Sequence, residues 1–150
     1  MAEKYCKIYV DGACRGNPGP GSIGIVVLKD GGIAMEHSEY LGQTTNNAAE
    51  YTAVQRALEL IRVSPNYQIV IFSDSALVVN QILGRWKIND PTLKSLNSTI
   101  QILLSMFSHR PILKKLPRNE AYLQRADELA NQILDYDRGQ AKAKVHGSFS

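Results

Sequence analysis

The N-terminal part of the chain alternates apolar and more polar side chains with the period of a strand. Cys6, Ile8 and Val10 are separated by single residues of the other kind, and the pattern ends near Asp11. A stretch rich in glycine and proline follows, and a glycine pair lies farther on, which are usual signs of turns and hairpins. The predicted strands cover residues 6–11, 23–28 and 33–41. Because short turns join them, we expect an antiparallel meander.

Helical spacing replaces the strand period in the next segment. Apolar residues recur three or four positions apart between residues 46 and 61, which predicts a helix with Thr44 or Thr45 as its N-cap. The continuous apolar run 69–72 predicts a strand buried on both faces, as in a parallel sheet covered by helices. Further helices are predicted over 77–83, 91–106 and 124–136, with a weaker strand over 111–116.

The predicted order, βββ-α-β-α-α-β-α, indicates an α/β fold with one mixed sheet and helices packed on it. No internal repeat or long linker interrupts this order, so we expect one domain over residues 1–137. From residue 138 to 150 the periodicity is lost and Gly, Lys, Ala and Ser dominate, which predicts a flexible C-terminal tail.

Composition narrows the class of protein. The chain has 150 residues, of which 44% are hydrophobic and 21% charged, and these values exclude a wholly disordered protein. It has no apolar run long enough to cross a membrane, and residues 1–7 do not resemble a secretory signal. Its two cysteines, Cys6 and Cys14, form no disulfide framework and no metal-binding pair. We therefore expect a cytoplasmic protein with no membrane partner.

The charge is unevenly distributed along the chain. The formal net charge is +3, but residues 85–125 carry eight basic and two acidic residues, a net +6, while the rest carries −3. A basic region beside a separate acidic cluster suits a polyanionic substrate and a cation-dependent site. A solvated face with a chance asymmetry is the alternative interpretation.

Four carboxylates lie at unusual places in the predicted elements. Asp11 ends the first strand, and Asp74 directly follows the buried strand. Glu50 shares an otherwise apolar helical stripe, and Asp127 lies near the start of the last helix on its apolar side. Three of them have a purely structural alternative: a turn residue for Asp11, an N-cap for Asp74 and a favourable interaction with the helix dipole for Glu50.

Taken together, the four carboxylates favour a metal site. Converged carboxylates repel one another unless a cation neutralises them, and oxygen-only ligands favour hard ions such as Mg²⁺ or Mn²⁺. The histidines, His37, His109 and His146, are scattered as surface or strand residues, and no HExxH or CxxC spacing indicates zinc. The glycine-rich stretch 16–21 lacks the ending of a phosphate-binding loop, which argues against a nucleoside triphosphate site.

These acidic residues belong to four longer motifs. Residues 9–19 (YVDGACRGNPG), 44–51 (TTNNAAEY), 72–75 (FSDS) and 125–131 (RADELAN) resemble, in order and spacing, the four motifs of type 1 ribonuclease H. The resemblance extends from about residue 7 to 131. It implies a five-stranded mixed sheet whose first three strands are antiparallel.

The resemblance also implies an activity and its cofactors. Asp11, Glu50, Asp74 and Asp127 would hold two Mg²⁺ ions, with Mn²⁺ as a possible substitute, and Asp11 would bridge both. The implied reaction is endonucleolytic cleavage of RNA in an RNA/DNA hybrid, leaving 5′-phosphate and 3′-hydroxyl ends. We expect the hybrid as the partner of a monomeric protein.

Substrate contacts follow from the same motifs. Residues that resemble the family's hybrid-binding positions are Gly12, Asn17, Thr45, Asn46, Asn47, Arg85, Trp86 and Lys87. The asparagines can both donate to and accept from the RNA 2′-hydroxyl in the minor groove, whereas Thr45 would contact a DNA phosphate. Trp86 and its basic neighbours would form the floor of a DNA-strand channel. Turn formation and capping are the alternative for the asparagines, and a partly buried anchor is the alternative for Trp86.

The chain departs from the family pattern in two places. Many members have a histidine in the loop before the last aspartate, but residues 116–124 contain none and instead provide Arg118 and Glu120. Arg118 would stabilise phosphate charge without shuttling a proton, and Glu120 would order a water or metal. The segment 86–91 is short, so the basic handle of some relatives is missing. We expect an active enzyme with slower product release.

Two other functions stay open on sequence alone. A nucleic-acid-binding module on the same fold would lack hydrolysis, but it would gain nothing from carboxylates clustered near phosphates. A related two-metal nuclease, such as a DNA exonuclease, would use the same carboxylates. The pair Asn46–Asn47 beside Glu50 favours RNA recognition over that alternative.

Overall fold

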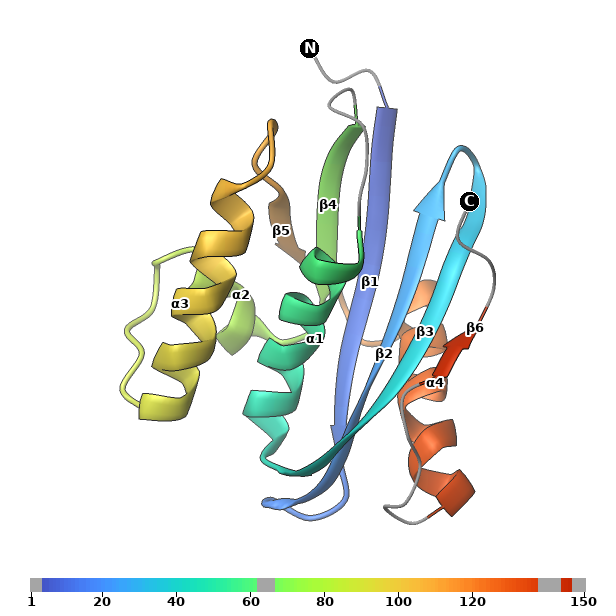
Figure 1. Cartoon of the computed structure of the whole chain (residues 1–150), viewed down its shortest axis with the longest axis vertical. Coiled ribbons are helices and arrows are strands. Elements are labelled where there is room, and N and C mark those ends of the chain that lie inside the picture. The colour runs from blue at the N-terminus through green and yellow to red at the C-terminus, as the bar shows by residue number, and fades with distance from the viewer. Residues whose placement is uncertain (1–3, 62–66, 138–143, 147–150) are drawn as a thin grey trace.

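The computed structural model describes residues 4–61, 67–137 and 144–146. The chain folds into a mixed sheet with helices on both faces (Figure 1). In chain order the elements are β1 (Lys4–Cys14), β2 (Gly19–Lys29), β3 (Gly32–Thr44), α1 (Asn46–Leu60), β4 (Tyr67–Ser73), α2 (Ala76–Ile82), α3 (Pro91–Ser105), β5 (Ile112–Lys115), α4 (Ala121–Asp137) and β6 (Lys144–His146). The predicted order of strands and helices is confirmed through α4.

The strand order across the sheet is β5-β4-β1-β2-β3-β6. β1 pairs with β2, and β2 with β3, in antiparallel register, as the short turns predict. β4 then enters beside β1 in parallel, and β5 continues parallel to β4. Strands β1 to β5 therefore form the five-stranded mixed sheet that the motifs imply.

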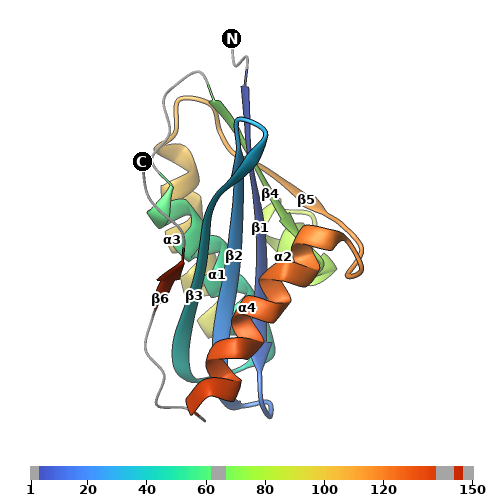
Figure 2. The same cartoon turned by 90° about the vertical axis from the view of Figure 1, so that its right-hand side faces the viewer.

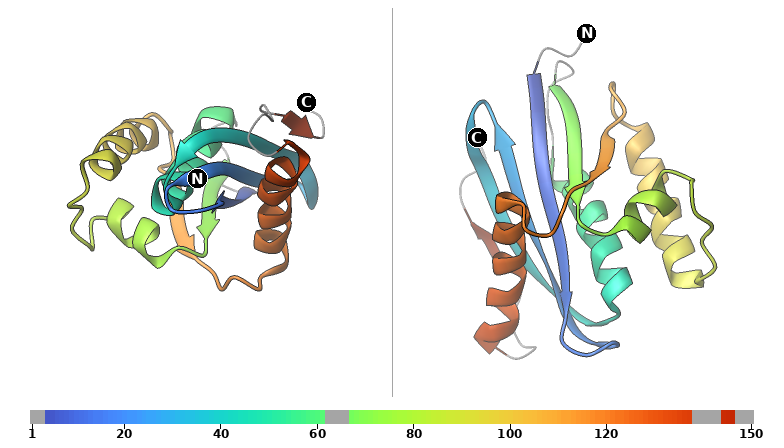
Figure 3. Two further views of the ribbon diagram at one scale, coloured as in Figure 1. Left: turned by 90° about the horizontal axis from the view of Figure 1, so that it is seen from below. Right: turned by 180° about the vertical axis from the view of Figure 1, so that it is seen from behind.

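Helices cover the two faces of the sheet unequally (Figures 2 and 3). α1, α2 and α3 lie on one face, where the main core packs Ile8, Ile25 and Ile71 against Val54 and Ile100. α4 crosses the other face over β1 to β3 and encloses a smaller core. α4 approaches β2 very closely, since a Cβ placed on Gly24 would lie 1.9 Å from the carbonyl oxygen of Ala126. Glycine at this position therefore permits the short distance between α4 and the sheet.

Side-chain caps decide where the helices begin. Thr45, not Thr44, caps α1 by accepting a hydrogen bond from the Ala48 amide. Ser75 caps α2, so Asp74 is not the N-cap that its position allows. α4 begins three residues before the predicted position because the Glu120 carboxylate accepts hydrogen bonds from the amides of Tyr122 and Leu123. Capping groups thus override the apolar period at these ends.

One short strand lies within the segment predicted as a flexible tail. β6 pairs antiparallel with β3 through the register Glu36↔His146, His37↔Val145 and Ser38↔Lys144. The prediction of an irregular segment is wrong for these three residues, because the exposed edge of β3 supplies pairing partners that local periodicity cannot reveal. The remaining tail positions, 138–143 and 147–150, lie outside the described residues.

Two further sequence predictions bear on the whole chain. Cys6 and Cys14 are both free, so the predicted lack of a disulfide between them is confirmed. Within the described ranges, no helix is long and apolar enough to span a membrane.

Candidate active site

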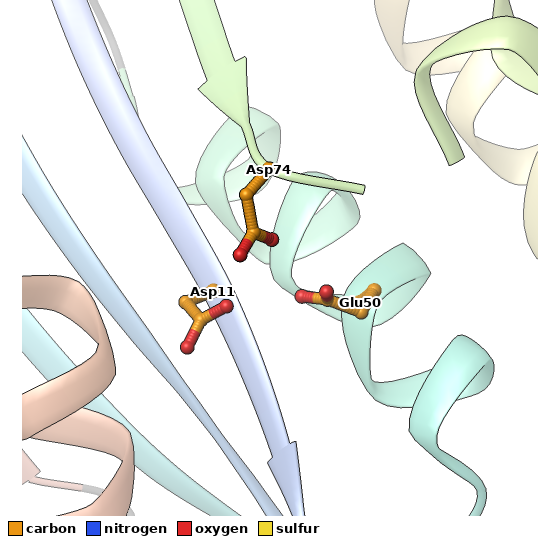
Figure 4. A group of neighbouring side chains, drawn as sticks. All are labelled: Asp11, Glu50 and Asp74. Atoms are coloured by element: carbon orange, nitrogen blue, oxygen red, sulfur yellow. The ribbon is translucent and has the colours of Figure 1, made fainter. Parts of the chain in front are cut away.

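Three carboxylates converge at one end of the sheet (Figure 4). Asp11 comes from β1, Glu50 from the first turns of α1 and Asp74 from the residue after β4. An oxygen from each carboxylate lies within 4.8 Å of the others. Asp11 and Glu50 are both only 8% exposed, so this acidic cluster is sheltered from water.

Strand register explains why Asp11 and Asp74 meet. β1 and β4 run parallel, and Tyr9↔Phe72 is the last pair between them. Asp11 and Asp74 each lie two residues beyond that pair, at the same end of the two strands. The carboxyl ends of neighbouring parallel strands are the usual position for ligand sites in α/β folds.

Gly12 brings the third carboxylate within reach. A Cβ on Gly12 would lie 2.6 Å from the backbone of Ala49 and Glu50, so only glycine lets α1 pack this close to β1. The Gly12 amide donates a 2.6 Å hydrogen bond to Glu50 Oε1, which fixes the carboxylate next to Asp11. The structure thus gives Gly12, a predicted substrate contact, a clear role in positioning Glu50.

Asp127 approaches the acidic cluster from α4. It lines the same cleft as the other three carboxylates, and its proximity contributes to the raised pKa of Asp11. The Asn131 side-chain amide donates 3.0 Å to Asp127 Oδ1, and its oxygen accepts 3.0 Å from the Arg15 guanidinium. Arg15 also bonds Asp135 at 2.7 Å, so α4 is tied to the loop after β1. The four predicted carboxylates therefore face one cleft. Asp11, on β1, lies between Glu50, which comes from α1 on one face of the sheet, and Asp127, which comes from α4 on the other face.

The cleft gathers four carboxylates and one cationic side chain, Arg118. Burial, followed by the charges of Glu50 and its other acidic neighbours, raises the pKa of Asp11 to about 10. Burial, followed by the charge of Asp74, raises the pKa of Glu50 to about 8, although the Gly12 amide opposes this shift. An oxygen-only, strongly acidic donor set with no lysine or histidine in its lining fits hard divalent cations.

Arg118 lies closest to this charge among the predicted loop residues. Its Nε donates 3.3 Å to Asp74 Oδ2, while its side chain is 92% exposed, so it can turn toward solvent or a ligand. Glu120, predicted beside it as a catalytic group, is not among the residues that line the cleft and instead holds the start of α4. These two neighbours therefore have different structural surroundings.

The predicted substrate residues fall into two groups. Asn46 lines the cleft, and its amide donates 2.9 Å to the Asn17 side chain, which ties the first glycine-rich loop to the start of α1. Asn47 is exposed one residue farther along, and Thr45 caps the helix. In contrast, Arg85, Trp86 and Lys87 do not line the cleft and lie on the loop between α2 and α3.

Sequence reasoning missed several residues around the cleft. Asn131 follows Asp127 by one helical turn, so its spacing is a signal that was available. Arg15 lies within the motif 9–19, but its contact with α4, like the approach of Asn119 to the cleft, depends on how two loops are folded. His37, which sequence reasoning left among surface or strand residues, is a strand residue that is only 3% exposed and bonds Glu39.

Comparison with known proteins agrees with this arrangement. The sequence pattern of the RNase H family matches residues 3–134. This chain belongs to the ribonuclease H family. It is 43% identical over 128 residues to a ribonuclease HI of Halobacterium salinarum. The aligned region covers 85% of the chain but only 63% of that protein. The crystal structure of RNase H1 from the same archaeon superposes with a TM-score of 0.79 at 39% identity, covering 88% of the chain and 98% of that structure.

Two further relatives extend the comparison. The bifunctional protein Rv2228c of Mycobacterium tuberculosis is 37% identical over 130 residues, which cover 85% of the chain and 35% of that protein. LC11-RNase H1, solved in complex with an RNA/DNA hybrid, superposes with a TM-score of 0.77 at 36% identity, covering 87% of the chain and 97% of that structure. The chain thus spans less than two thirds of the length of the archaeal and mycobacterial relatives.

Proposed function

We propose that the chain is an endoribonuclease that hydrolyses the RNA strand of RNA/DNA hybrids. The observation that carries this proposal is the meeting of Asp11, Glu50, Asp74 and Asp127 in one cleft of a ribonuclease H fold. In the reaction, water adds to the phosphorus and the bond to the RNA 3′-oxygen breaks. The products are a 5′-phosphate and a 3′-hydroxyl.

Two divalent ions, Mg²⁺ or in its place Mn²⁺, complete the proposed site. Asp11, Glu50, Asp74 and Asp127 would hold them, with Asp11 shared because it lies between Glu50 and Asp127. When bound, such ions activate the attacking water and stabilise the leaving oxygen of an in-line displacement. The neighbouring carboxylate charges, which add to burial in raising the pKa values of Asp11 and Glu50, support cation binding because they also attract a metal ion.

Recognition of RNA is assigned to the rim of the cleft. Asn17, Asn46 and Asn47 present amides at the junction of the first loop and α1, where they can donate to and accept from 2′-hydroxyls. Gly12, which lines the cleft, is assigned a backbone contact with the hybrid, and Thr45 is assigned a DNA phosphate. The hybrid complex of LC11-RNase H1 supports a hybrid as the ligand.

Binding of the DNA strand is assigned to the loop that carries Arg85, Trp86 and Lys87. Trp86 is 50% exposed between two exposed cations, which suits a stacking or sugar contact beside phosphates. Arg118 would stabilise phosphate charge at the cleft, and Glu120 would order a water or a metal during turnover.

We also propose that residues 1–137 form the catalytic domain and that the protein is monomeric. We propose that it works in the cytoplasm, where free Cys6 and Cys14 stay reduced.

Cleavage of a 5′-labelled RNA strand tests the proposal. The strand is paired with DNA, paired with RNA, or left single, and assayed with Mg²⁺, Mn²⁺ or EDTA, with Asp74→Asn in parallel. We expect cutting only in the DNA-paired strand, lost in EDTA and in the variant. Binding without cutting by the wild-type protein with either metal would indicate a binding module, whereas equal cutting of a DNA duplex would indicate a different nuclease.

A further inference from the structure

The loop between α2 and α3 is held firmly although it lies on the surface. The backbone amides of Arg85 and Trp86 both donate to the Asn80 carbonyl, at 2.8 and 3.2 Å. The chain reverses at Gly84, whose φ of +78° favours glycine and whose amide donates 3.0 Å to the Gln81 carbonyl. These bonds anchor the first half of the loop to the end of α2.

A buried side chain anchors the second half of the loop. The Gln81 side-chain amide donates 2.9 Å to the Lys87 carbonyl, so it fixes the peptide between Lys87 and Ile88, just after Trp86 and Lys87. Gln81 is 8% exposed and its oxygen accepts 2.6 Å from the Tyr51 hydroxyl. Because its oxygen faces a donor and its nitrogen faces an acceptor, only one orientation of the amide satisfies both partners.

Tyr51 connects this anchor to the acidic cluster. It is fully buried on α1, directly after Glu50 in sequence. Its hydroxyl donates the 2.6 Å hydrogen bond to the Gln81 side-chain oxygen. One continuous path of backbone and two hydrogen bonds therefore runs from a proposed metal ligand to the loop that carries Trp86.

We propose that Tyr51 and Gln81 are positioning residues that set the Arg85–Lys87 loop relative to the carboxylate site. A loop ordered before binding loses less conformational freedom when the hybrid docks, so the two buried hydrogen bonds raise affinity without touching substrate. This inference rests on the proposed function, which assigns hybrid contacts to the same loop. It adds an internal determinant of affinity to that assignment.

Steady-state kinetics on a hybrid test the inference with two variants. Tyr51→Phe removes only the hydroxyl, and Gln81→Met keeps length while removing both hydrogen bonds. We expect KM to rise roughly three- to tenfold in each, the size of one lost buried hydrogen bond, with kcat within about twofold of wild type. Tyr67→Phe is the matched control, because its hydroxyl bonds Asp30 at the far end of β4 and its loss leaves KM unchanged.

Trp86 provides a direct readout because it is the only tryptophan in the sequence. In EDTA, where cleavage is absent, acrylamide quenching of its fluorescence reports the mobility of the loop, and fluorescence titration with hybrid reports binding. We expect faster quenching and weaker binding in Tyr51→Phe and Gln81→Met than in Tyr67→Phe. If Tyr51 and Gln81 had a merely structural role, their variants would have a lower Tm, but their quenching and KM would match those of Tyr67→Phe.

A double-mutant comparison separates this inference from the proposed function. If the buried pair acts through the loop, adding Gln81→Met to Trp86→Ala raises KM less than it does in the wild-type background. An increase in KM for Trp86→Ala, with wild-type values for Tyr51→Phe and Gln81→Met, would overturn the positioning role alone. An unchanged KM for Trp86→Ala would instead overturn the assignment of hybrid binding to the loop, and the inference with it.

Discussion

Asp11 has three acidic neighbours and little access to water, and this combination links folding to protonation. Burial and the neighbouring charges raise its pKa to about 10 in the folded chain, from an ordinary value of 3.8. The folded state without metal therefore retains a proton that the unfolded state releases. The resulting contribution to stability is complete below about pH 4 and declines as the pH rises toward 10.

Replacing Asp11 should remove this pH-dependent contribution to stability. Asp11→Asn has no proton to lose, so we expect its Tm in EDTA to exceed that of wild type by an amount that grows between about pH 5 and pH 8, reaching several degrees. Thermal unfolding of both proteins at a series of pH values measures the difference. A difference in Tm that is the same at every pH would show that the Asp11 carboxyl is not protonated by its surroundings.

Arg118 offers charge to the cleft without the proton chemistry of a histidine. It is held by one 3.3 Å hydrogen bond to Asp74 and is otherwise in solvent, so its replacement should hardly affect stability. We expect Arg118→Ala to reduce the steady-state rate on a hybrid by roughly tenfold or more, with Arg118→Lys recovering part of it. Comparison of single-turnover with steady-state rates locates the defect in chemistry or in product release. Wild-type values for both rates would exclude a role for this loop.

At the scale of elements, the sequence shows the types of element better than their ends. Periodicity is a property of the whole strand or helix, so β1 to β5 and all four helices are predicted in the right order. Ends depend on single side chains, such as Ser75 and Glu120, whose capping competes with other uses of the same residue types. β6 and the Tyr51–Gln81 bond depend on segments distant in sequence, and no local pattern encodes such contacts.

The same distinction applies to the candidate site. The four carboxylates stand out in sequence because Glu50 and Asp127 lie on apolar sides of helices and Asp11 and Asp74 lie at or just after the ends of predicted strands. Their supporting residues do not stand out, since Asn131 and Arg15 look like ordinary helix and loop residues until α4 is placed beside the first loop. Placement of the four carboxylates is thus predictable from local pattern, whereas the groups that orient them depend on tertiary packing.

The contact between β1 and α1 makes Gly12 sensitive to the smallest substitution. In Gly12→Ala the new methyl group would overlap the backbone of Ala49 and Glu50, so the helix must move away from the strand. We expect a loss of about 1–3 kcal/mol in the free energy of unfolding and a larger loss of cleavage, because Glu50 moves with the helix. Chemical denaturation and hybrid cleavage measure the two effects. Gly32→Ala is the matched control, since nothing lies within 4 Å of its Cβ position, and an equally small effect of both changes would contradict the close packing.

At the scale of the whole molecule, the sheet places the site between two helical layers that differ in thickness. β1 and β4 bring Asp11 and Asp74 together within the sheet, α1 adds Glu50 from the thicker side, and α4 adds Asp127 from the other. The only element beyond α4 in the described ranges is β6, which extends the sheet at β3, on the side away from β4 and Asp74. The catalytic arrangement and the C-terminal strand therefore occupy separate parts of the molecule.

Truncation after Asp137 tests whether this separation is functional. The shortened chain retains every element that positions a carboxylate but loses β6, so residues 36–38 of β3 lose their backbone pairing partners. We expect a Tm lower by a few degrees and, at temperatures where the protein stays folded, hybrid cleavage within about twofold of the full chain. Circular dichroism follows folding, and the labelled-hybrid assay follows activity. A truncated chain that fails to fold would show that the catalytic domain extends to the last strand, because the edge of β3 then needs its partner for the sheet to form.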